Sequence, residues 1–545
     1  SLSLSLSLSL SLSLSLSPHF ATEKDFVTTD MTSGLTFHVP PEYSQLRVCG
    51  SGAFASVCEA TWTNPHGTAA PLDAAPGDTA AAPQRSSSSP APPQVVKVAI
   101  KRLGNIACRD QTCTEAFRLN YLRKLCREIE ILSYFVGCHQ ILEIRDAWLG
   151  PGGRDLYLVT DFMSHTFLEV IRGNERSEEV NKWILFQVLC GLDILHRCSV
   201  IHRDITPSNL FLEQSSSVAC IGDFGLSRAK LNTDELATLD VVTLPYRAPE
   251  VLMQKANYGE AVDIWSLGCI LAELTLKRPF LYTDRGDSAK QLHRVFQSVT
   301  GFPEDDEAIA ANASETAQQY LRKWRLAVHD APNRHAPLPA KPDLREPFLD
   351  PVTGTPMLSE AGVQFLQRCL TFDARRRPTA RVLIDDPWFS QADDTTGEDY
   401  YVPARREHNE ETKWRDGPMR CDTDALQTVN EQLQWLNGRV AAVQLFSSPR
   451  GLEDTAALLN QDVAAVSTLL AQPGDTRDAA ELTTNLVAEG LSSSGRSRGS
   501  RHDSIQRWHH LLESELNPDA IAGFIASRTC QEVNLQFDGR LPRFV

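Results

Sequence analysis

The sequence predicts an α+β protein in which a small strand-rich part precedes a larger helical part. Short strand-like runs surround a glycine-containing turn between residues 37 and 60 and recur at 95–103 and 141–163. From about residue 180 to residue 389, helical patterns alternate with short polar loops. The length of 545 residues allows more than one domain.

The strand-rich part begins with FHVPPEYSQLRVCGSGAFASVCEA and continues, after an interruption, with VVKVAIKRL. The interruption, residues 62–94, consists mainly of Ala, Pro, Ser and Gly, a composition that does not bury a core. We expect a disordered insertion in a hairpin, because the entropy of loop closure grows slowly with length.

The next elements are a helix followed by a strand pair. TEAFRLNYLRKLCREIEILSYF has helical spacing, and ILEIRDAWL and DLYLVTDFM flank the turn at residues 150–153. The helical part opens with NKWILFQVLCGLDILHRC. These elements complete the predicted order of a small mixed unit and then a helical one.

Composition limits the partners and the compartment. The net charge of −16 and the pI near 5.4 disfavour nucleic acid as the main partner. We expect no membrane contact, because no run of eighteen apolar residues occurs, and reduced thiols, because the 13 cysteines are scattered without a C-x-x-C pair. Without a targeting segment we expect the cytoplasm, with nuclear entry left open.

Both ends differ from the central part. Residues 1–36 are expected to be a low-complexity, disordered tail, and the Ser-Leu repeat at 1–16 is excluded from fold reasoning. Residues 391–424 are predicted to be an acidic tail or linker, and 425–545 a partly helical extension with helices near 425–445 and 453–471. An interaction module and an autoinhibitory tail both remain open for this extension.

Several motifs carry groups suited to a phosphate ligand. Gly50-x-Gly52 lies at a turn between strands, where backbone N–H groups approach a ligand closely. Lys101 ends a strand, and Glu128 lies on the next helix at a spacing that permits an ion pair. Each pattern alone is common. Three motifs follow in order: His202-Arg203-Asp204 with Asn209, then Asp223-Phe224-Gly225, then Ala248-Pro249-Glu250.

This ordered set resembles the protein kinases of the serine/threonine type, and among them the mitogen-activated protein kinases. The resemblance covers residues 37–390 and implies the two-lobed protein-kinase fold, with residues 282–360 matching an insert late in the C-terminal lobe. Further matching stretches are LCREIEIL, CHQILEIRDAW, YLVTDFM, VIHRDITPSNL, IGDFGLSR, YRAPEVL and AVDIWSLGCILAEL.

The resemblance implies ATP and Mg²⁺ as cofactors and assigns roles to individual residues. Asp204 is the implied base for the substrate hydroxyl, Lys101 with Glu128 holds the ATP phosphates, and Asn209 and Asp223 hold Mg²⁺. Thr206 stands beside them in the catalytic loop. The implied ATP contacts are Val48, Gly50, Ser51, Gly52, Ala53, Phe54, Ala55, Ser56, Val57, Ala99, Lys101, Thr160, Asp161, Met163 and Phe211.

The resemblance also implies regulation by phosphorylation. Thr238 stands at the activation-loop position, so an upstream kinase is an expected partner. Arg247 marks the kinases that phosphorylate Ser or Thr followed by Pro, and Asp393, Asp394, Glu398 and Asp399 fall where relatives bind basic docking peptides. The cations expected to bind the Thr238 phosphate are Lys124, Arg127, Arg203 and Arg228.

Four positions depart from the family pattern. Ala55 replaces the third loop glycine, and Asp240 stands where a second activation-loop residue, a tyrosine, is usual. Leu244-Pro245 is closer to the cyclin-dependent kinases. Thr206 replaces a lysine that neutralises the transferring phosphate, and losing one such donor lowers rates on the order of 10²–10³-fold. An active kinase is therefore the main hypothesis, with a weakly active or inactive pseudokinase scaffold or a cyclin-dependent-kinase-like enzyme as alternatives.

Overall fold

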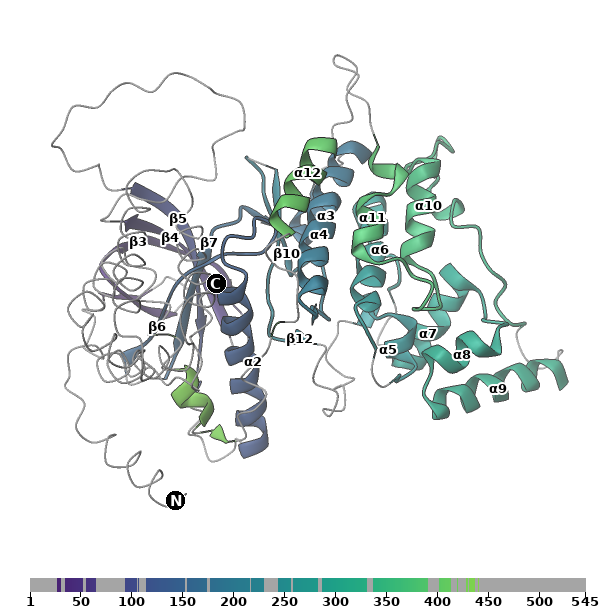
Figure 1. Ribbon diagram of the computed structural model, residues 1–545, viewed down its shortest axis with the longest axis horizontal. Helices are drawn as coiled ribbons and strands as arrows, with labels where there is room; N and C mark the ends of the chain where they lie inside the picture. The colour runs from purple at the N-terminus through teal and green to yellow at the C-terminus, as the bar shows by residue number, and fades with distance from the viewer. Residues whose placement is uncertain are drawn as a thin grey trace, which may run out of the picture. The chain divides into compact units, whose positions relative to one another are not determined.

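The computed structural model divides the chain into two compact units (Figure 1). The first comprises residues up to 137, 142–162 and 422 onward, and the second comprises 138–141 and 163–421. The structure describes residues 27–30, 35–51, 55–64, 94–104, 106, 114–151, 154–173, 177–215, 217–229, 244–255, 258–282, 287–330, 337–390, 401–412, 419, 428–429, 431–436 and 440.

The first unit is built on an antiparallel five-stranded sheet, with strand order β3-β4-β5-β7-β6. A separate hairpin, β1-β2, precedes it, and helix α2 follows β5. The bounds are β1 Val27–Asp30, β2 Thr36–Val39, β3 Tyr43–Ser51, β4 Ala55–Asn64, β5 Gln94–Leu103, α2 Glu115–Tyr134, β6 Ile144–Leu149 and β7 Leu156–Asp161.

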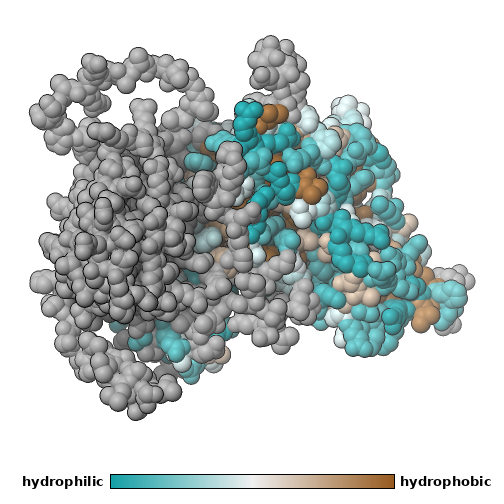
Figure 2. All heavy atoms as spheres, in the orientation of Figure 1, coloured by the Kyte–Doolittle hydropathy of each residue, from teal (hydrophilic) through white to brown (hydrophobic). Residues whose placement is uncertain are grey.

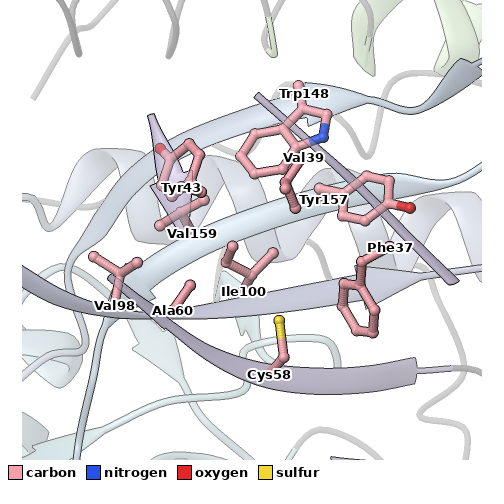
Figure 3. Packing of buried hydrophobic residues seen from close by; sticks show 10 residues of the cluster. All are labelled: Phe37, Val39, Tyr43, Cys58, Ala60, Val98, Ile100, Trp148, Tyr157 and Val159. Atoms are coloured by element: carbon pink, nitrogen blue, oxygen red, sulfur yellow. The ribbon is translucent and has the colours of Figure 1, made fainter. Parts of the chain in front are cut away.

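The sheet has a period-two pattern that separates a core face from a polar face. On β5, Val98 and Ile100 are fully buried, whereas Ala99 and Lys101 are only partly buried. Figure 3 shows that the core face carries aromatic and aliphatic side chains, and these come from all five strands of the sheet and from β2. Trp148 stacks on Tyr157 with ring centroids 5.3 Å apart, which fixes β6 against β7.

Helix α2 begins where the sequence supplies a cap. The hydroxyl of Thr114 accepts a hydrogen bond from the backbone N–H of Phe117, and Glu115 places a negative charge in the first turn. The predicted helix and the predicted strand pair around residues 150–153 are therefore confirmed.

The second unit is mainly helical, with two small sheets of order β11-β10-β8 and β12-β9. The helices are α3 Phe167–Arg172, α4 Glu178–Arg197, α5 Pro249–Leu252, α6 Ala261–Leu276, α7 Ser288–Val295, α8 Asp306–Asn312, α9 Glu315–Asp330, α10 Glu360–Cys369, α11 Ala380–Ile384 and α12 Tyr401–Thr412. The strands are β8 His165–Thr166, β9 Val200–Ile201, β10 Leu210–Glu213, β11 Val218–Ile221 and β12 Arg228–Ala229. Short turns are η2 Leu244–Tyr246, η3 Phe296–Thr300, η4 Glu346–Phe348 and η5 Pro387–Phe389.

Helices α4 and α6 form the interior of this unit. Along α6, all residues from Val262 to Leu274 are buried. Gly268 lets α6 approach α10 closely, because a Cβ there would lie 2.8 Å from the Cβ of Cys369. A first unit built on a sheet and a second, mainly helical unit confirm the predicted α+β, two-lobed organisation.

Two expectations about chain organisation need correction. The expected insertion begins later and ends earlier than 62–94, because β4 extends to Asn64, which pairs with Gln94; residues 65–93 lie outside the described residues. Part of the predicted linker at 391–424 is instead α12. This helix is held because Tyr401 is buried against Phe186 and Phe389. The acidic residues expected there at 393, 394, 398 and 399 lie outside the described residues, as does the helix expected near 453–471.

The surface of the second unit in Figure 2 is mostly hydrophilic, with small separated apolar spots. Leu326 on α9 is among the more exposed apolar residues, at 59%. Within the described residues, every helix is too short or too polar to cross a membrane.

A buried ion pair joins distant parts of the second unit. The guanidinium of Arg377 binds both carboxylate oxygens of Glu250, at 2.8 and 3.2 Å, and both side chains are almost completely buried. Arg377 also donates to the carbonyls of Ala261 and Thr371, and its guanidinium lies 5.2 Å from the ring centre of Trp265. The pair thus connects the residues before α11 with α5 and α6.

Arg377→Met is expected to lower the free energy of unfolding by about 3–5 kcal/mol, because it leaves the Glu250 carboxylate buried without its cation. The matched control is Arg345→Met, which removes a similar two-bond pair with Glu360 at an exposed position. Urea unfolding followed by tryptophan fluorescence measures both. Equal midpoints for the two variants would contradict the assignment.

Candidate functional site

The first part of the site is an ion pair on the polar face of the five-stranded sheet. The ammonium of Lys101 on β5 lies 2.6 Å from a carboxylate oxygen of Glu128 on α2. Glu128 is buried, whereas 24% of the Lys101 side chain remains exposed. The pair therefore holds an ammonium group at a fixed place on that face, as the sequence predicted.

Neighbouring strands add the other predicted ATP contacts on this face. Val57 on β4 lies directly opposite Lys101, and Thr160 on β7 lies directly opposite Ala99. Residues opposite each other in an antiparallel pair project to the same face. The side chains of Val57, Ala99, Lys101 and Thr160 thus form one surface.

The glycine-rich turn is described on both of its sides. Gly50 pairs with Val57, and the hydroxyls of Ser51 and Ser56 lie 3.3 Å apart. A Cβ at Gly50 would meet no atom of the described residues within 4 Å. Ala55 begins β4, and Gly52, Ala53 and Phe54 lie outside the described residues.

The prediction that Val48 contacts ATP is wrong for its side chain. Val48 lies opposite Cys58 and packs with it in the hydrophobic core, on the face away from Lys101. An irregularity in β3 between Val48 and Gly50 changes the register. The resemblance implied this contact from the motif alone, and the motif carries no sign of the irregularity.

Asp161 and Met163 were predicted to present backbone groups to the adenine. Asp161 ends β7, and its carboxylate accepts hydrogen bonds from the guanidinium of Arg145 at 2.5 and 3.0 Å. The backbone N–H of Asp161 donates to the carbonyl of Glu143. Met163 is the first residue of this segment that belongs to the second unit.

The second part of the site is a loop in the helical unit, between β9 and β10. Its backbone is held by Asp263 of α6, whose carboxylate accepts hydrogen bonds from the N–H groups of His202 and Arg203 at 2.9 and 2.8 Å. His196 of α4 lies 2.9 Å from the same carboxylate. Burial alone would raise the pKa of the Asp263 carboxyl. The hydrogen bond to His196, the charge of that imidazole and the hydrogen bond from the Arg203 N–H together have a larger effect, so the pKa of Asp263 is lowered.

The His202 ring connects two of the sequence motifs. Its Nε2 lies 3.1 Å from the carbonyl of Gly222, and its Nδ1 accepts from the N–H of Asp204 at 3.3 Å. The ring also packs edge-on against Phe224, with centroids 5.0 Å apart. This packing fixes the loop carrying Asp204 relative to the segment carrying Asp223.

Asn209 orients Asp204, and both side chains were predicted site residues. The Asn209 amide nitrogen donates to the backbone carbonyl and to a carboxylate oxygen of Asp204, each at 2.8 Å. Because the nitrogen is committed, the amide oxygen is the atom left for a cation. Asn209 and Asp223 each carry a hard oxygen atom of the kind that Mg²⁺ takes as a ligand, one or two from protein and the rest from phosphate and water. Phe211 lies just beyond on β10, opposite Cys220 and Thr166.

Backbone strain is concentrated at two of these motifs. Arg203 and Asp223 have φ values of +71° and +62°, in the left-handed region. Such conformations cost on the order of 1–3 kcal/mol each and persist where surrounding contacts hold them. Asp263 holds Arg203, and the N–H of Gly225 donates to the carboxylate of Asp223 at 3.4 Å.

Thr206 occupies the position where relatives place a lysine. It is 2% exposed, and its hydroxyl lies 3.0 Å from that of Ser208. The side chain therefore supplies no charge, and its hydroxyl already has a neighbour within the loop.

The cations predicted to bind a phosphorylated Thr238 are described, but Thr238 itself lies outside the described residues. In the second unit, Arg203 is buried with its guanidinium 5.5 Å from the ring centre of Tyr258, and Arg228 begins β12. The Nε of Arg203 is buried and has no hydrogen-bond partner within the part of the chain that the structure describes. In the first unit, Arg127 is buried on α2 and Lys124 is exposed there.

The buried carboxylate of Glu273 holds the segment that carries Arg247. Tyr246 donates through its hydroxyl to Glu273 of α6 at 2.9 Å, and the N–H of Phe280 donates to the other oxygen at 3.3 Å. Burial raises the pKa of Glu273 from 4.5 to about 7, against the opposing effect of these hydrogen bonds.

Sequence reasoning did not identify Asp263 and Glu273. Both lie in the stretch AVDIWSLGCILAEL, where they are the only charged residues. A carboxylate that is buried in an apolar helix needs a hydrogen-bond or charge partner. A carboxylate within an apolar helical stretch was therefore the sequence feature that could have pointed to these two residues. The partners of Asp263, the N–H groups of His202 and Arg203, lie 61 and 60 positions away in the chain.

Comparisons with known proteins agree with this geometry. A family model described as "Protein kinase domain" matches residues 94–389. Mitogen-activated protein kinase 5 from Oryza sativa subsp. indica is 33% identical over 305 residues, covering 55% of this chain and 73% of that protein. Mitogen-activated protein kinase 6 from Oryza sativa subsp. japonica is 32% identical over 338 residues, covering 59% and 80%. Cyclin-dependent kinase G-1 from the indica subspecies is 34% identical over 302 residues, covering 54% and 40%.

The raised pKa of Glu273 predicts a pH-dependent stability. The folded protein retains this proton between pH 4.5 and about 7, whereas the unfolded chain releases it, so stability falls as pH rises through this range. Glu273→Gln should remove this slope, so that the variant gains on the order of 2 kcal/mol relative to wild type between pH 5 and pH 8. Urea unfolding at several pH values measures the difference, with the exposed Glu315→Gln as control. A constant difference between Glu273→Gln and wild type would contradict the prediction.

Proposed function

This chain belongs to the protein kinase family and is a serine/threonine protein kinase similar to the mitogen-activated protein kinases, and we propose that it transfers the γ-phosphate of MgATP to Ser and Thr hydroxyls followed by Pro. The observation that carries the proposal is the ion pair between Lys101 and Glu128. An ammonium held at one place on an open sheet face is suited to the phosphates of a nucleotide.

Each residue has a distinct role in the proposed reaction. Lys101 binds the α- and β-phosphates, and Asp204 orients the substrate hydroxyl and accepts its proton. Asn209 holds Asp204 in place and, with Asp223, supplies oxygen ligands for Mg²⁺. The cation, when bound, neutralises charge on the phosphates. Asp263 acts on this chemistry only by holding the loop backbone.

We further propose that phosphorylation of Thr238 by an upstream kinase raises the activity. Arg203 supports this role, because its guanidinium is largely buried and its Nε lacks a hydrogen-bond partner within the described residues. A phosphate adds about −1.5 to −2 charges and would complete that hydrogen bonding. Lys124, Arg127 and Arg228 are the further proposed cations, and Asp240 supplies one fixed negative charge near the same position.

Substrate selection is proposed to involve Arg247 and the acidic residues after position 390. Arg247 follows Tyr246, whose hydroxyl is anchored by Glu273, so the backbone around it is held in one conformation. A rigid segment beside the substrate favours one residue type after the phosphorylated position. Asp393, Asp394, Glu398 and Asp399 are the proposed contacts for basic docking peptides.

One observation favours a second candidate function, a weakly active kinase that acts mainly as a scaffold. Thr206 lacks the charge of the usual lysine and is bonded within its own loop. The similarity to cyclin-dependent kinase G-1 keeps a cyclin-dependent-kinase-like enzyme as another reading. The ordered set of Lys101, Glu128, Asp204, Asn209 and Asp223 favours the active kinase.

The direct test is transfer of radiolabelled phosphate from MgATP to Ser-Pro peptides by the full chain. Wild type should label the peptides, and Asp223→Ala should lower the rate by at least about 10³-fold, because an oxygen ligand for Mg²⁺ is lost. Peptides with Ala in place of Pro are the specificity control. Labelling equal to that of Asp223→Ala would favour the scaffold. Mass spectrometry of the same reactions reports whether Thr238 carries phosphate.

Thr206→Lys should raise kcat about 10- to 100-fold, because a lysine there neutralises charge on the transferring phosphate. Ser208→Ala is the matched control, since it removes the hydroxyl next to Thr206 without adding charge. Steady-state kinetics with saturating MgATP measures kcat for both variants and so separates the effect of the added charge from that of the lost hydroxyl. An unchanged kcat in Thr206→Lys would show that the missing lysine does not limit the reaction.

A further inference from the structure

The chain itself contains dipeptides of the kind that the proposed kinase would phosphorylate. A Ser or Thr directly precedes Pro at five places: Ser17, Ser89, Thr206, Thr355 and Ser448. The structure describes two of these residues, Thr206 and Thr355. Thr206 is 2% exposed, and the catalytic loop holds its hydroxyl beside that of Ser208. Thr355 is exposed, so within the described residues it is the Thr-Pro that another protein can reach.

Thr355 lies on a tight turn at the surface of the second unit. A bridge between Leu349 and Pro356 closes the turn, and residues 351–356 are all exposed. Val352 on this turn is 91% exposed, although an aliphatic side chain is normally at least partly covered. The turn therefore projects into solvent rather than packing on the unit that carries it.

Asp350 organises this turn. Its carboxylate accepts hydrogen bonds from the N–H groups of Val352 and Thr353, at 2.9 and 2.7 Å, and from the Thr353 hydroxyl at 2.9 Å. The bonds from Thr353, and then the bond from Val352, lower the pKa of the Asp350 carboxyl, so it is ionised at neutral pH. The N–H of Asp350 donates to the carbonyl of Thr355 at 2.8 Å, and the N–H of Gly354 donates to the carbonyl of Asp350 at 2.8 Å. These bonds all join residues of the turn to one another.

The local chain at Thr355 is suited to entering an active site. Because Pro356 follows, the backbone at Thr355 is disfavoured from the helical region and is biased toward extended conformations. Its hydroxyl lies 2.7 Å from that of Thr353, so it is held by a neighbour on the same turn. A solvent-exposed turn whose bonds are local opens at a small fraction of the free energy of global unfolding. Thr355 can therefore be presented to a kinase while the core stays folded.

The turn lies near the start of α4. Ser359, four residues after Thr355, donates through its N–H and its hydroxyl to the carboxylate of Glu178, the first residue of α4. Phe348 and Leu358 are buried on the two sides of the turn, at 1% and 3% exposure. Because both ends are fixed in the core, the turn stays at this end of the helix even when its own hydrogen bonds open.

Asp204 lies near the other end of α4. Its loop is bound to the Asp263 carboxylate, which also contacts His196 in the last turn of that helix. The 20 residues of α4 span about 30 Å. Thr355 is three residues from the buried Leu358, which allows a reach of only about 10 Å. Thr355 therefore does not reach the Asp204 of its own chain, and a second copy must supply the active site.

We propose that Thr355 is a phosphorylation site at which one copy of this chain modifies another, and that the phosphate opens the turn. The inference rests on the proposed function. The bond between the γ-phosphorus of MgATP and the oxygen that bridges to the β-phosphate breaks, and a bond forms from that phosphorus to the Oγ1 of Thr355. The hydroxyl proton passes to the Asp204 carboxylate of the acting copy, and ADP leaves. The phosphate adds about −1.5 to −2 charges on the turn that the ionised Asp350 holds together, and like charges repel.

The first test uses two isotopically distinct copies of the full chain. Unlabelled wild type is mixed with MgATP and with isotope-labelled Asp223→Ala, which serves as the acceptor, and mass spectrometry locates the phosphate on each copy. Thr355 of the labelled copy should gain phosphate at a rate that rises with the wild-type concentration. Pro356→Ala in the labelled copy should lower this rate at least about tenfold. Thr353 is the matched control, because it is exposed on the same turn but precedes Gly, and it should stay unmodified.

The outcomes separate this inference from the proposed function. Ser-Pro peptides are added as a parallel substrate, and Asp223→Ala incubated alone gives the background. Labelled peptides with an unmodified Thr355 would overturn the inference and leave the proposed function in place. Phosphate on Thr355 of the wild-type copy alone would indicate reaction within one chain and would also overturn it. Peptides and Thr355 that both stay unlabelled would refute the proposed function together with the inference.

The second test asks whether the phosphate opens the turn. Hydrogen–deuterium exchange at the N–H groups of Val352 and Thr353, which donate to Asp350, should become about tenfold faster after phosphorylation of Thr355. Asp350→Asn removes the fixed charge, so phosphorylation of this variant should change the exchange rate by less than about twofold. The amides of α10 are the internal control and should exchange equally in both forms. Unchanged exchange at Val352 and Thr353 in the phosphorylated wild type would overturn the proposed opening.

Discussion

The arrangement of the catalytic loop depends on one buried carboxylate. Asp263 accepts hydrogen bonds from two consecutive backbone N–H groups and lies beside His196, so it joins α4, α6 and the loop after β9. The backbone at Arg203 is in a conformation that an L-residue rarely adopts, and its hydrogen bond to Asp263 stabilises that conformation. Asp204 is directed by the same loop, and Asn209 then fixes its carboxylate. The Asp263 carboxylate, buried inside an apolar helix, therefore fixes the backbone of the loop that carries Asp204.

In the first unit, an ion pair between a strand and a helix fixes the position of the Lys101 ammonium. Lys101 is placed by the register of β5 with β4 and β7, which leaves little freedom along the strand. Glu128 is placed by α2, which contacts the sheet through the ion pair with Lys101 and is buried from Leu125 to Leu132. A sheet residue is fixed by its ladder of hydrogen bonds, whereas a helix needs contacts on its sides. This difference explains why α2 carries so many buried residues.

The sequence was sufficient where spacing along one element determines position. The ordered motifs and the resemblance they carry identified Lys101, Glu128, Asp204, Asn209 and Asp223. The resemblance failed for the side chain of Val48, because an irregularity in β3 between Val48 and Gly50 changes the register without a sequence signal. Sequence analysis also missed α12, whose stability comes from aromatic contacts with α4 and η5 and from a hydrogen bond between His408 and Asp193. Contacts between residues more than 200 positions apart carry no local pattern.

The same physical reasoning bears on whether the chain is an enzyme. A scaffold needs an exposed surface and a stable core, and neither requires strained residues at a loop. Here Arg203 and Asp223 both lie in the left-handed region, and a buried carboxylate, an oriented imidazole and an amide hold their surroundings. Each of these features costs stability that a close-packed apolar loop would not. Such a network is useful when a carboxylate must be held ready for reaction. We therefore propose that the neutral Thr206 affects the rate of phosphoryl transfer rather than the geometry on which transfer depends.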